Sequence, residues 1–235
     1  MNRKPRMQGI VWLPADGDPD DFPPVEQALE QPDGLLAAGG DLSRARLLSA
    51  YRRGIFPWYS DGQPILWWSP DPREILWPAE FHCSRSLARS LRKRGYETRY
   101  DSDFAAVIDA CAAPRGDSTG TWITAAMRSA YLDLHAFGLA HSIESWRDGV
   151  LAGGLYGVQL GRVFFGESMF SHETDASKVA LARLVGDARA RDLQLIDCQM
   201  ATQHLRRMGS RPMPRADFVT WLDKLCPAVA GDRPH

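Results

Sequence analysis

Three strand-like patterns in a row constrain the fold of this chain more than any other feature of its sequence. They occupy residues 141–146, 150–158 and 162–170. Arg147-Asp148-Gly149 separates the first two and has the composition of a hairpin turn. Strands joined by such short turns pair antiparallel, whereas parallel strands need long crossover connections. The pattern therefore predicts an antiparallel meander and argues against a doubly wound parallel sheet.

Helical patterns surround this meander. They cover residues 42–54, 84–94, 104–112, 125–137, 177–188, 202–208 and 218–225, and a short buried strand is expected at 193–198. The first 80 residues differ from the rest because they hold most of the prolines and repeated turn signals. We therefore predict an α+β protein, with a small N-terminal α/β domain at 1–75 and a domain resembling the acetyltransferase-like (GNAT-like) fold at 76–235.

The composition excludes several classes of protein. The 235 residues carry a formal net charge of −1, so any surface for a polyanion must be local. No apolar run approaches the roughly 18–20 residues that span a bilayer, and we expect no membrane contact. The four cysteines are far apart and no export signal is found, which favours reduced thiols and a cytoplasmic location. His and Cys lack metal-ligand spacing and no nucleotide-binding loop occurs, so we expect neither a metal nor a cofactor.

Two short motifs look catalytic but lack the context that their chemistry needs. Ser168 lies in Gly166-Glu-Ser-Met-Phe170, where a nucleophile elbow requires a second glycine in place of the phenylalanine. Arg183-Leu-Val-Gly-Asp-Ala188 matches an acetyl-CoA signature, whose backbone N–H groups must be free at a strand-to-helix turn. The match falls inside a predicted helix, where those groups are bonded, so we interpret it as a coincidence.

A basic stripe is expected on the helix at 84–94. Its positive side chains recur at helical spacing on one side, at Arg85, Arg89, Arg92 and Lys93. Such a stripe is either a solvated helix face or a contact surface for nucleic-acid phosphates, and the composition alone does not choose between them.

Three stretches of sequence together indicate a family. The first is Gly34-Leu-Leu-Ala-Ala-Gly-Gly-Asp-Leu-Ser43, which continues through Tyr51-Arg-Arg-Gly-Ile-Phe-Pro-Trp58 to Trp67-Trp-Ser-Pro-Asp-Pro-Arg73. The second is Gly120-Thr-Trp-Ile-Thr124. The third is Phe165-Gly-Glu-Ser-Met-Phe-Ser171, followed by Ile196-Asp-Cys-Gln199. With these motifs the chain resembles the bacterial leucyl/phenylalanyl-tRNA–protein transferases from about residue 23 to residue 222.

This resemblance implies an aminoacyltransferase. Members of the family take Leu, Phe and, less readily, Met from aminoacyl-tRNA. They attach the amino acid to the α-amine of proteins that begin with Arg or Lys, which marks these proteins for degradation by the N-end rule pathway. The partners implied are therefore Leu-tRNA, Phe-tRNA and such acceptor proteins, and the basic stripe would bind the tRNA. One chain would carry the whole site, so we expect a monomer.

The resemblance also implies roles for single residues. Trp58 and Trp122 resemble the aromatic residues that hold the 3′-terminal adenosine of the tRNA. The residues implied at or near the apolar pocket for the aminoacyl side chain are Leu155, Phe164, Met169, Tyr51 and Tyr131. The polar, catalytic centre would consist of Glu167, Asp197 and Gln199.

From the residues themselves, two interpretations of each carboxylate stay open. Asp197 follows an apolar strand, where a carboxylate needs a partner. It either caps the helix at Thr202 or belongs to a site with Gln199, two positions away on an extended segment. Glu167 is either a solvated strand residue or, together with Asp197, an anionic pocket for a cationic N-terminus. We favour the second interpretation in each case.

Two other functions compete with this hypothesis. An acetyl-CoA-dependent N-acetyltransferase would share the predicted fold, and a tRNA-binding module without catalysis would share the basic stripe. The misplaced signature at Arg183 argues against the first, while the presence of Asp197 and Gln199 argues against the second.

Overall fold

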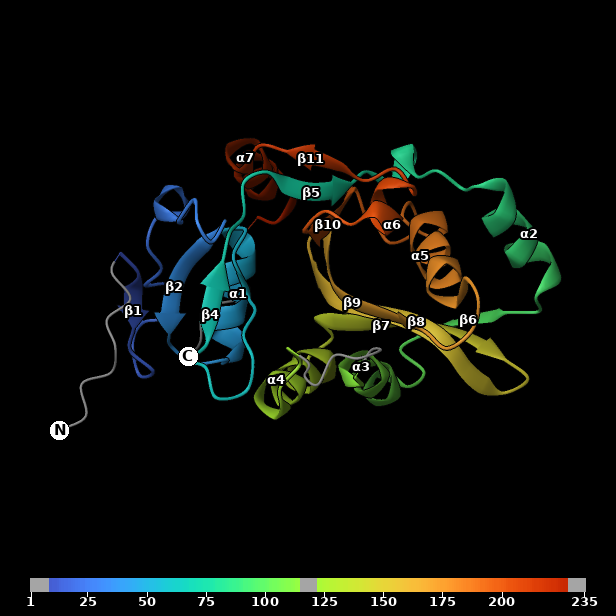
Figure 1. Ribbon diagram of the computed structural model, residues 1–235, viewed down its shortest axis with the longest axis horizontal. Coiled ribbons are helices and arrows are strands. Elements are labelled where there is room, and N and C mark those ends of the chain that lie inside the picture. The colour runs from blue at the N-terminus through green and yellow to red at the C-terminus, as the bar shows by residue number, and fades with distance from the viewer. Residues whose placement is uncertain (1–8, 115–121, 228–235) are drawn as a thin grey trace.

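The computed structural model describes residues 9–114 and 122–227 (Figure 1). The strands are β1 (Val11–Leu13), β2 (Leu35–Gly39), β3 (Phe56–Pro57), β4 (Leu66–Trp68), β5 (Arg73–Leu76), β6 (Glu97–Tyr100), β7 (Ala140–Arg147), β8 (Val150–Leu160), β9 (Val163–Ser171), β10 (Leu195–Gln199) and β11 (Arg211–Met213). The helices are α1 (Arg44–Arg52), α2 (Arg85–Lys93), α3 (Phe104–Ala112), α4 (Ala125–Ala136), α5 (Ala176–Gly186), α6 (Gln203–Arg206) and α7 (Arg215–Leu225). Gly120 and Thr121 of the second motif lie outside the described residues.

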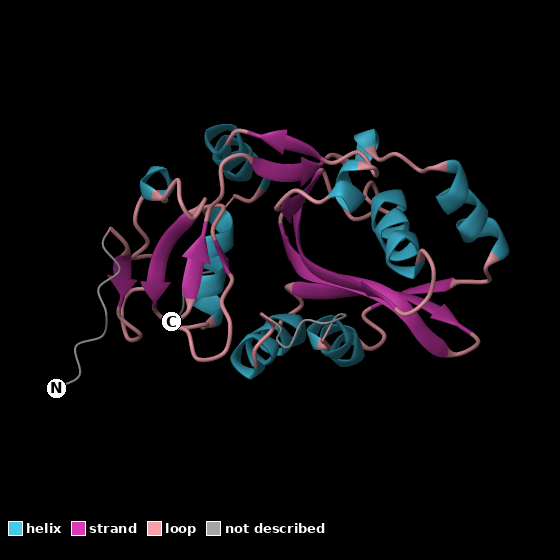
Figure 2. Ribbon diagram, in the orientation of Figure 1, coloured by secondary structure: helices cyan, strands magenta, loops and turns pink. Residues whose placement is uncertain are grey.

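The described strands form two sheets (Figure 2). The smaller sheet has the order β1-β2-β4-β3, and the larger has the order β11-β5-β10-β9-β8-β7-β6. Strands β7, β8 and β9 are the predicted antiparallel meander, and Asp148 and Gly149 form its first turn with positive φ. The α+β class predicted from the sequence is confirmed.

Most helices begin at a side chain that caps the first free backbone N–H groups. Such caps are Ser43 for α1, Ser84 for α2, Asp103 for α3, Thr124 for α4 and Thr202 for α6. The predicted helix positions agree with these starts to within about two residues. Short polar residues before apolar periodic segments therefore decide where the chain enters each helix.

Helices cover both faces of the larger sheet (Figure 1). α3 and α4 pack on one face of the meander, α5 packs on the other, and α2 lies against α5. α7 returns to α1, where Gly54 has a φ of +73° and a Cβ would lie 3.2 Å from a ring carbon of Phe218. Trp67, Phe165 and Phe218 belong to one buried apolar cluster that joins the two sheets. The change of sheet occurs between β4 and β5, and the division into domains at residues 1–75 and 76–235 stays a prediction.

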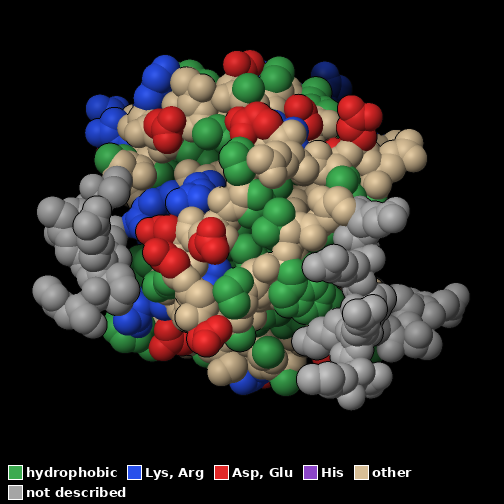
Figure 3. Space-filling model, turned by 90° about the vertical axis from the view of Figure 1, so that its left-hand side faces the viewer, with side chains coloured by type: hydrophobic (Ala, Val, Ile, Leu, Met, Phe, Trp, Pro, Cys, Tyr) green, Lys and Arg blue, Asp and Glu red, His purple; other side chains and the backbone are tan. Residues whose placement is uncertain are grey.

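The surface on the N-terminal side mixes charges (Figure 3). Lys and Arg side chains lie beside Asp and Glu there, with apolar side chains between them. No helix within residues 9–114 and 122–227 has the length and apolar character needed to cross a membrane. In the same ranges, no group of three or more His, Cys, Asp or Glu side chains is arranged to hold a metal ion.

Candidate active site

A cavity of about 400 Å³ opens where β9 and β10 separate. The two strands pair in parallel only from Val163 to Phe165 on β9 and from Leu195 to Asp197 on β10. Beyond this point β9 continues along β8, whereas β10 pairs with β5. The strands thus form a fork, and residues that follow the last parallel pair line the cavity.

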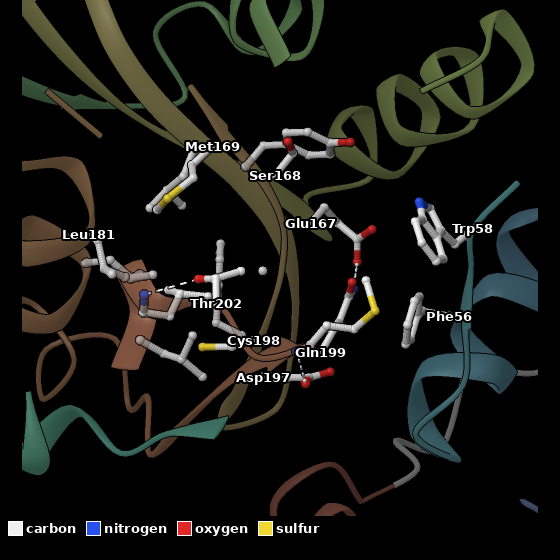
Figure 4. A pocket seen from close by; sticks show the side chains of 18 of the residues that line it. Phe56, Trp58, Glu167, Ser168, Met169, Leu181, Asp197, Cys198, Gln199 and Thr202 are labelled. Carbon is white, nitrogen blue, oxygen red and sulfur yellow. Dashed lines mark hydrogen bonds between the residues drawn. The ribbon is translucent and has the colours of Figure 1, made fainter. Parts of the chain in front are cut away.

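Each arm of the fork carries a β-bulge at its mouth. The register between β8 and β9 shifts so that Glu167 has no opposite residue, and the register between β10 and β5 shifts so that Cys198 has none. A bulge changes the direction in which the following side chains point. Glu167 and Gln199 consequently point toward each other across the cavity, and Gln199 Nε2 donates to Glu167 Oε1 at 2.9 Å (Figure 4).

Asp197 is paired inside the protein with Arg73, which was not predicted to be a site residue. Arg73 Nε and Nη2 donate to the two carboxylate oxygens at 2.8 and 2.7 Å. The Arg73 side chain is 1% exposed and that of Asp197 is 0% exposed. Arg73 Nη1 also donates to the carbonyl oxygen of Gly54, at 3.0 Å. The prediction that Asp197 joins Glu167 in an anionic pocket for a cationic N-terminus is therefore wrong for Asp197, because Arg73 already neutralises this carboxylate.

Asp197 instead positions Gln199 through the backbone. Its Oδ1 accepts the backbone N–H of Gln199 at 2.8 Å, and Gln199 has a φ of +60°. A non-glycine residue held in this left-handed region costs about 1–3 kcal/mol, which surrounding contacts must offset. Asp197 and Gln199 both line the cavity, as expected of one site, but the bulge at Cys198 interrupts the regular strand alternation from which this was argued. The helix-cap alternative is also wrong, since the hydroxyl of Thr202 caps α6 itself.

Glu167 lies buried among three hydrogen-bond partners. Tyr51 Oη meets Glu167 Oε1 and Tyr131 Oη meets Oε2, each at 2.8 Å, and the third partner is the amide of Gln199, which donates to Oε1. Burial raises the pKa of Glu167 to about 7, and the charge of Asp197 acts in the same direction. The hydrogen bonds from the two tyrosines and the charge of Arg73 oppose this rise. The solvated-strand alternative is wrong, because the residue is only 8% exposed.

Tyr51 and Tyr131 lie behind Glu167. Both are 0% exposed, and neither lines the cavity. Their hydroxyl oxygens are 2.5 Å apart. The resemblance implies a place for them near the aminoacyl pocket, and the structure corrects this placement: Tyr51 from α1 and Tyr131 from α4 hydrogen-bond the carboxyl group of Glu167 and do not line the cavity.

The deep half of the cavity is mainly apolar. It is lined by Leu155, Phe164, Met169, Leu181, Leu184 and Ile196, and the hydroxyl-bearing Ser168 and Thr202 lie beside Met169 and Leu181 (Figure 4). Of the six apolar residues, the first three were implied by the resemblance, and the last three were missed, although Leu181 and Leu184 lie on the apolar side of the predicted helix. At Gly157 a Cβ would lie 2.6 Å from a ring carbon of Phe164, so only glycine allows this ring to pack so closely on β8.

Aromatic side chains stand at the mouth of the same cavity. Trp58 and Trp122 both line it, and Trp58 is 37% exposed. Trp68 supports Trp58 by an edge-to-face contact and donates its ring N–H to the Trp58 carbonyl oxygen at 2.7 Å. The structure thus brings two predicted stacking residues to one opening, where a flat aromatic ligand can contact them.

The basic stripe lies on the outer side of α2. Arg85, Arg89, Arg92 and Lys93 are exposed, while Leu87 and Ser90 are buried toward the protein. None of the four basic residues lines the cavity. Contact of this stripe with nucleic acid stays a prediction.

Comparisons with known proteins agree with the motifs. The profile of a family described as "Leucyl/phenylalanyl-tRNA protein transferase" matches residues 75–223, and that of its N-terminal domain matches residues 40–71. Curated relatives with the name "Leucyl/phenylalanyl-tRNA--protein transferase" include one from Aromatoleum aromaticum, 62% identical over 91% of this chain and 89% of its own. Another, from Ectopseudomonas mendocina, is 57% identical over 92% of this chain and 94% of its own. A solved GCN5-related N-acetyltransferase from Kribbella flavida matches 68% of this chain and 57% of its own, with 12% identity and a TM-score of 0.40.

Proposed function

Because the chain belongs to the leucyl/phenylalanyl-tRNA–protein transferase family, we propose that it transfers Leu or Phe from tRNA to the α-amine of a protein. The observation that supports this most strongly is the division of the cavity. Its deep half is mainly apolar, its centre holds Glu167 and Gln199, and its mouth holds Trp58 and Trp122. An aminoacyl-adenosine ester has the same division into an apolar side chain, a polar ester and a flat base.

The reaction is the attack of an amine on an activated ester. A peptide α-amine has an ordinary pKa of about 7.7–8.0, so a useful fraction is neutral at cellular pH. Positioning of the two reactants can therefore supply much of the acceleration. Gln199 is far too weakly basic to remove a proton alone. Its amide instead orients the amine or the ester carbonyl by hydrogen bonds, where developing oxyanion charge is stabilised by donors.

The acceptor part of the proposal concerns proteins that begin with Arg or Lys. Of the two predicted carboxyl groups, Glu167 is the one that remains to meet a cationic N-terminus, because Arg73 neutralises Asp197. The test is transfer of labelled Leu from tRNA to peptides that begin with Arg, Lys, Gly or Asp. We expect product with the first two, and equal transfer to the Asp-initiated peptide would refute this acceptor class.

The acetyltransferase alternative is disfavoured by the position of its signature. Arg183 and Gly186 lie in the last turn of α5, so the match occupies the carbonyl end of a helix, which repels phosphate. At the other end of α5, the carboxylate of Asp175 already accepts from Ser90 Oγ and Lys178 Nζ. We expect no saturable binding in an acetyl-CoA titration, and stoichiometric binding would revive this alternative.

Donor choice is expected to follow apolar volume. The six apolar residues of the deep half offer no polar partner to a donor side chain, and such pockets discriminate one methylene by about 10–200-fold. Transfer of Met should therefore be about 10–200-fold less efficient than transfer of Leu, and Asp-tRNA or Lys-tRNA should give no product. Leu181→Phe, which fills part of the cavity, should lower Phe transfer more than Leu transfer. The matched control is Leu132→Phe outside the cavity, and efficient use of Asp-tRNA would disprove apolar selection.

The basic stripe is expected to contact tRNA phosphates. The association constant for tRNA falls with salt, and each lost phosphate contact makes the slope of its logarithm against log salt less steep by about 0.9. The triple variant Arg85→Ala, Arg89→Ala, Arg92→Ala should therefore have a slope that is less steep by about 2–3. The matched control removes Arg53, Arg99 and Arg162, each of which is already ion-paired with a nearby carboxylate. Binding of tRNA is measured from low to moderate salt. An unchanged slope for the α2 variant would assign the stripe to a solvated helix face.

A further inference from the structure

Three oxygen-to-oxygen contacts form a closed ring behind the cavity. Tyr51 Oη lies 2.8 Å from Glu167 Oε1, Tyr131 Oη lies 2.8 Å from Glu167 Oε2, and the two hydroxyl oxygens lie 2.5 Å apart. We call these two hydroxyl groups and the carboxyl group the proton ring. All three distances lie within the range of O–H···O hydrogen bonds, so each contact requires one proton.

The number of protons in the ring determines the protonation state of Glu167. Each tyrosine hydroxyl has one proton to donate, so the two tyrosines supply two protons for three contacts. The amide of Gln199 donates to Glu167 Oε1 and lies outside the ring, so it does not supply the third. An ionised Glu167 would leave one pair of oxygens facing each other without a hydrogen. A protonated carboxyl group supplies the missing proton and closes the ring.

We propose that Glu167 rests as a neutral carboxylic acid whose proton completes this ring, and that a cationic α-ammonium entering the cavity drives the proton into solvent. In this step Glu167–COOH and R–NH₃⁺ become a carboxylate–ammonium pair, and one H⁺ leaves to the buffer. The charge of the pair falls from +1 to 0, and the proton released to the buffer carries the remaining +1. The second half of the proposal rests on the proposed function, whereas the first half does not.

The surroundings of Glu167 favour the neutral resting form. The titratable or charged groups around the ring are Tyr51 on α1, Tyr131 on α4, Tyr156 on β8, Asp197 on β10 and Arg73 on β5. Arg73 is bound to both oxygens of Asp197, so its positive charge mainly stabilises that carboxylate rather than the ionised form of Glu167. Burial raises the pKa of Glu167 to about 7, which agrees with the proton count.

The ring also gives the carboxylate a role in the transfer step. Once the ion pair has formed, Glu167 is the nearest base to the bound ammonium. Movement of one ammonium proton to the carboxylate restores the acid and the ring, and it leaves a neutral amine whose lone pair attacks the ester. A base with a pKa near 7 is well matched to an amine of about 7.7–8.0. Tyr51 and Tyr131 are then positioning residues that control this proton.

The free protein tests the first half without any transfer assay. Glu167→Gln replaces the carboxyl group by an amide that offers one donor and one acceptor, as the neutral acid does. The folded pKa of about 7 lies above the ordinary value of about 4.3, so this stability contribution is fully present below the ordinary value and is lost as pH rises through 7. The folding equilibrium constant of the wild type relative to Glu167→Gln should therefore fall about tenfold per pH unit between pH 5 and 7. A ratio that is flat or rises over this interval would overturn the neutral resting state.

A spectroscopic measurement covers the case in which Glu167→Gln folds poorly. Infrared difference spectra of the wild type between acid and alkaline pH should show the carbonyl band of one buried carboxylic acid that disappears near pH 7. Tyr51→Phe removes one member of the ring and should shift this band, whereas Tyr59→Phe, whose hydroxyl bonds Thr124, should leave it in place. Absence of a band titrating near pH 7 would overturn the ring.

Calorimetry with an Arg-initiated peptide tests the second half. At pH 6, in buffers of different ionisation enthalpy, binding should release nearly one proton in the wild type and none in Glu167→Gln. Binding without proton release would overturn the coupling, even if labelled Leu is still transferred. Conversely, failure of transfer with intact proton release would count against the proposed function and not against the ring.

Discussion

Replacing Asp197 with alanine is expected to lower the free energy of unfolding by about 3–5 kcal/mol and to abolish aminoacyl transfer. The loss of stability follows from Arg73, which is 1% exposed and would keep its charge without the carboxylate that binds both Nε and Nη2. The loss of transfer follows from Gln199, whose backbone N–H would lose its acceptor in a left-handed conformation. Chemical denaturation and single-turnover transfer measure the two effects.

A double substitution separates these effects. Arg73→Met with Asp197→Leu replaces the buried ion pair by apolar side chains, which is often neutral for stability, so most of the lost stability should return. Transfer should stay absent because Gln199 remains unsupported. The matched control is Asp41→Ala, which removes the partner of the buried Arg46 outside the cavity. This variant should destabilise the protein, but the molecules that stay folded should transfer the amino acid at the normal rate. Normal transfer by the double variant would show that Asp197 is not needed to place Gln199.

Gln199→Ala is expected to lower kcat by about 10²–10³-fold, the usual cost of removing one preorganised donor from a reacting centre. The amide of Gln199 reaches Glu167 across the fork, so its loss removes the link between β9 and β10 at the cavity. Binding of aminoacyl-tRNA should change little, because the apolar half and the tryptophans remain. Rapid-quench transfer and a separate tRNA-binding assay distinguish turnover from affinity.

An exposed glutamine on the same connection provides the control. Gln194→Ala, one residue before β10, should leave both turnover and binding unchanged. If Gln199→Ala weakened tRNA binding and left the rate of bound donor intact, the residue would belong to the binding surface. That result would also revive the tRNA-binding module without catalysis.

Much of the fold could be predicted because its signals are local. The turn at Asp148-Gly149 and the capping residues Ser43, Ser84 and Thr124 mark element boundaries in the sequence itself. Strands β5, β6 and β11 were missed because they are only three or four residues long. Such segments become strands by pairing with distant partners rather than by their own pattern.

The site was less predictable for a related reason. Strand alternation placed Asp197 and Gln199 on one side, but bulges shift side chains out of that alternation, and the sequence shows no sign of them. Arg73 closes the first family motif, yet its pairing with Asp197 joins residues 124 positions apart. The ring that joins Tyr51, Tyr131 and Glu167 likewise depends on three elements that only the folded chain brings together.

The most direct test of the proposed transfer site is single-turnover reaction of radiolabelled Leu-tRNA with an Arg-initiated peptide. We predict that the wild type moves the label onto the peptide α-amine, that an Nα-acetylated copy of the peptide receives none, and that Gln199→Ala bound to the same donor is slower by about 10²–10³-fold. The contrary result is label that stays on the tRNA with the folded wild type, or that reaches the peptide equally fast with Gln199→Ala. Either outcome would remove the fork between β9 and β10 as the site of aminoacyl transfer.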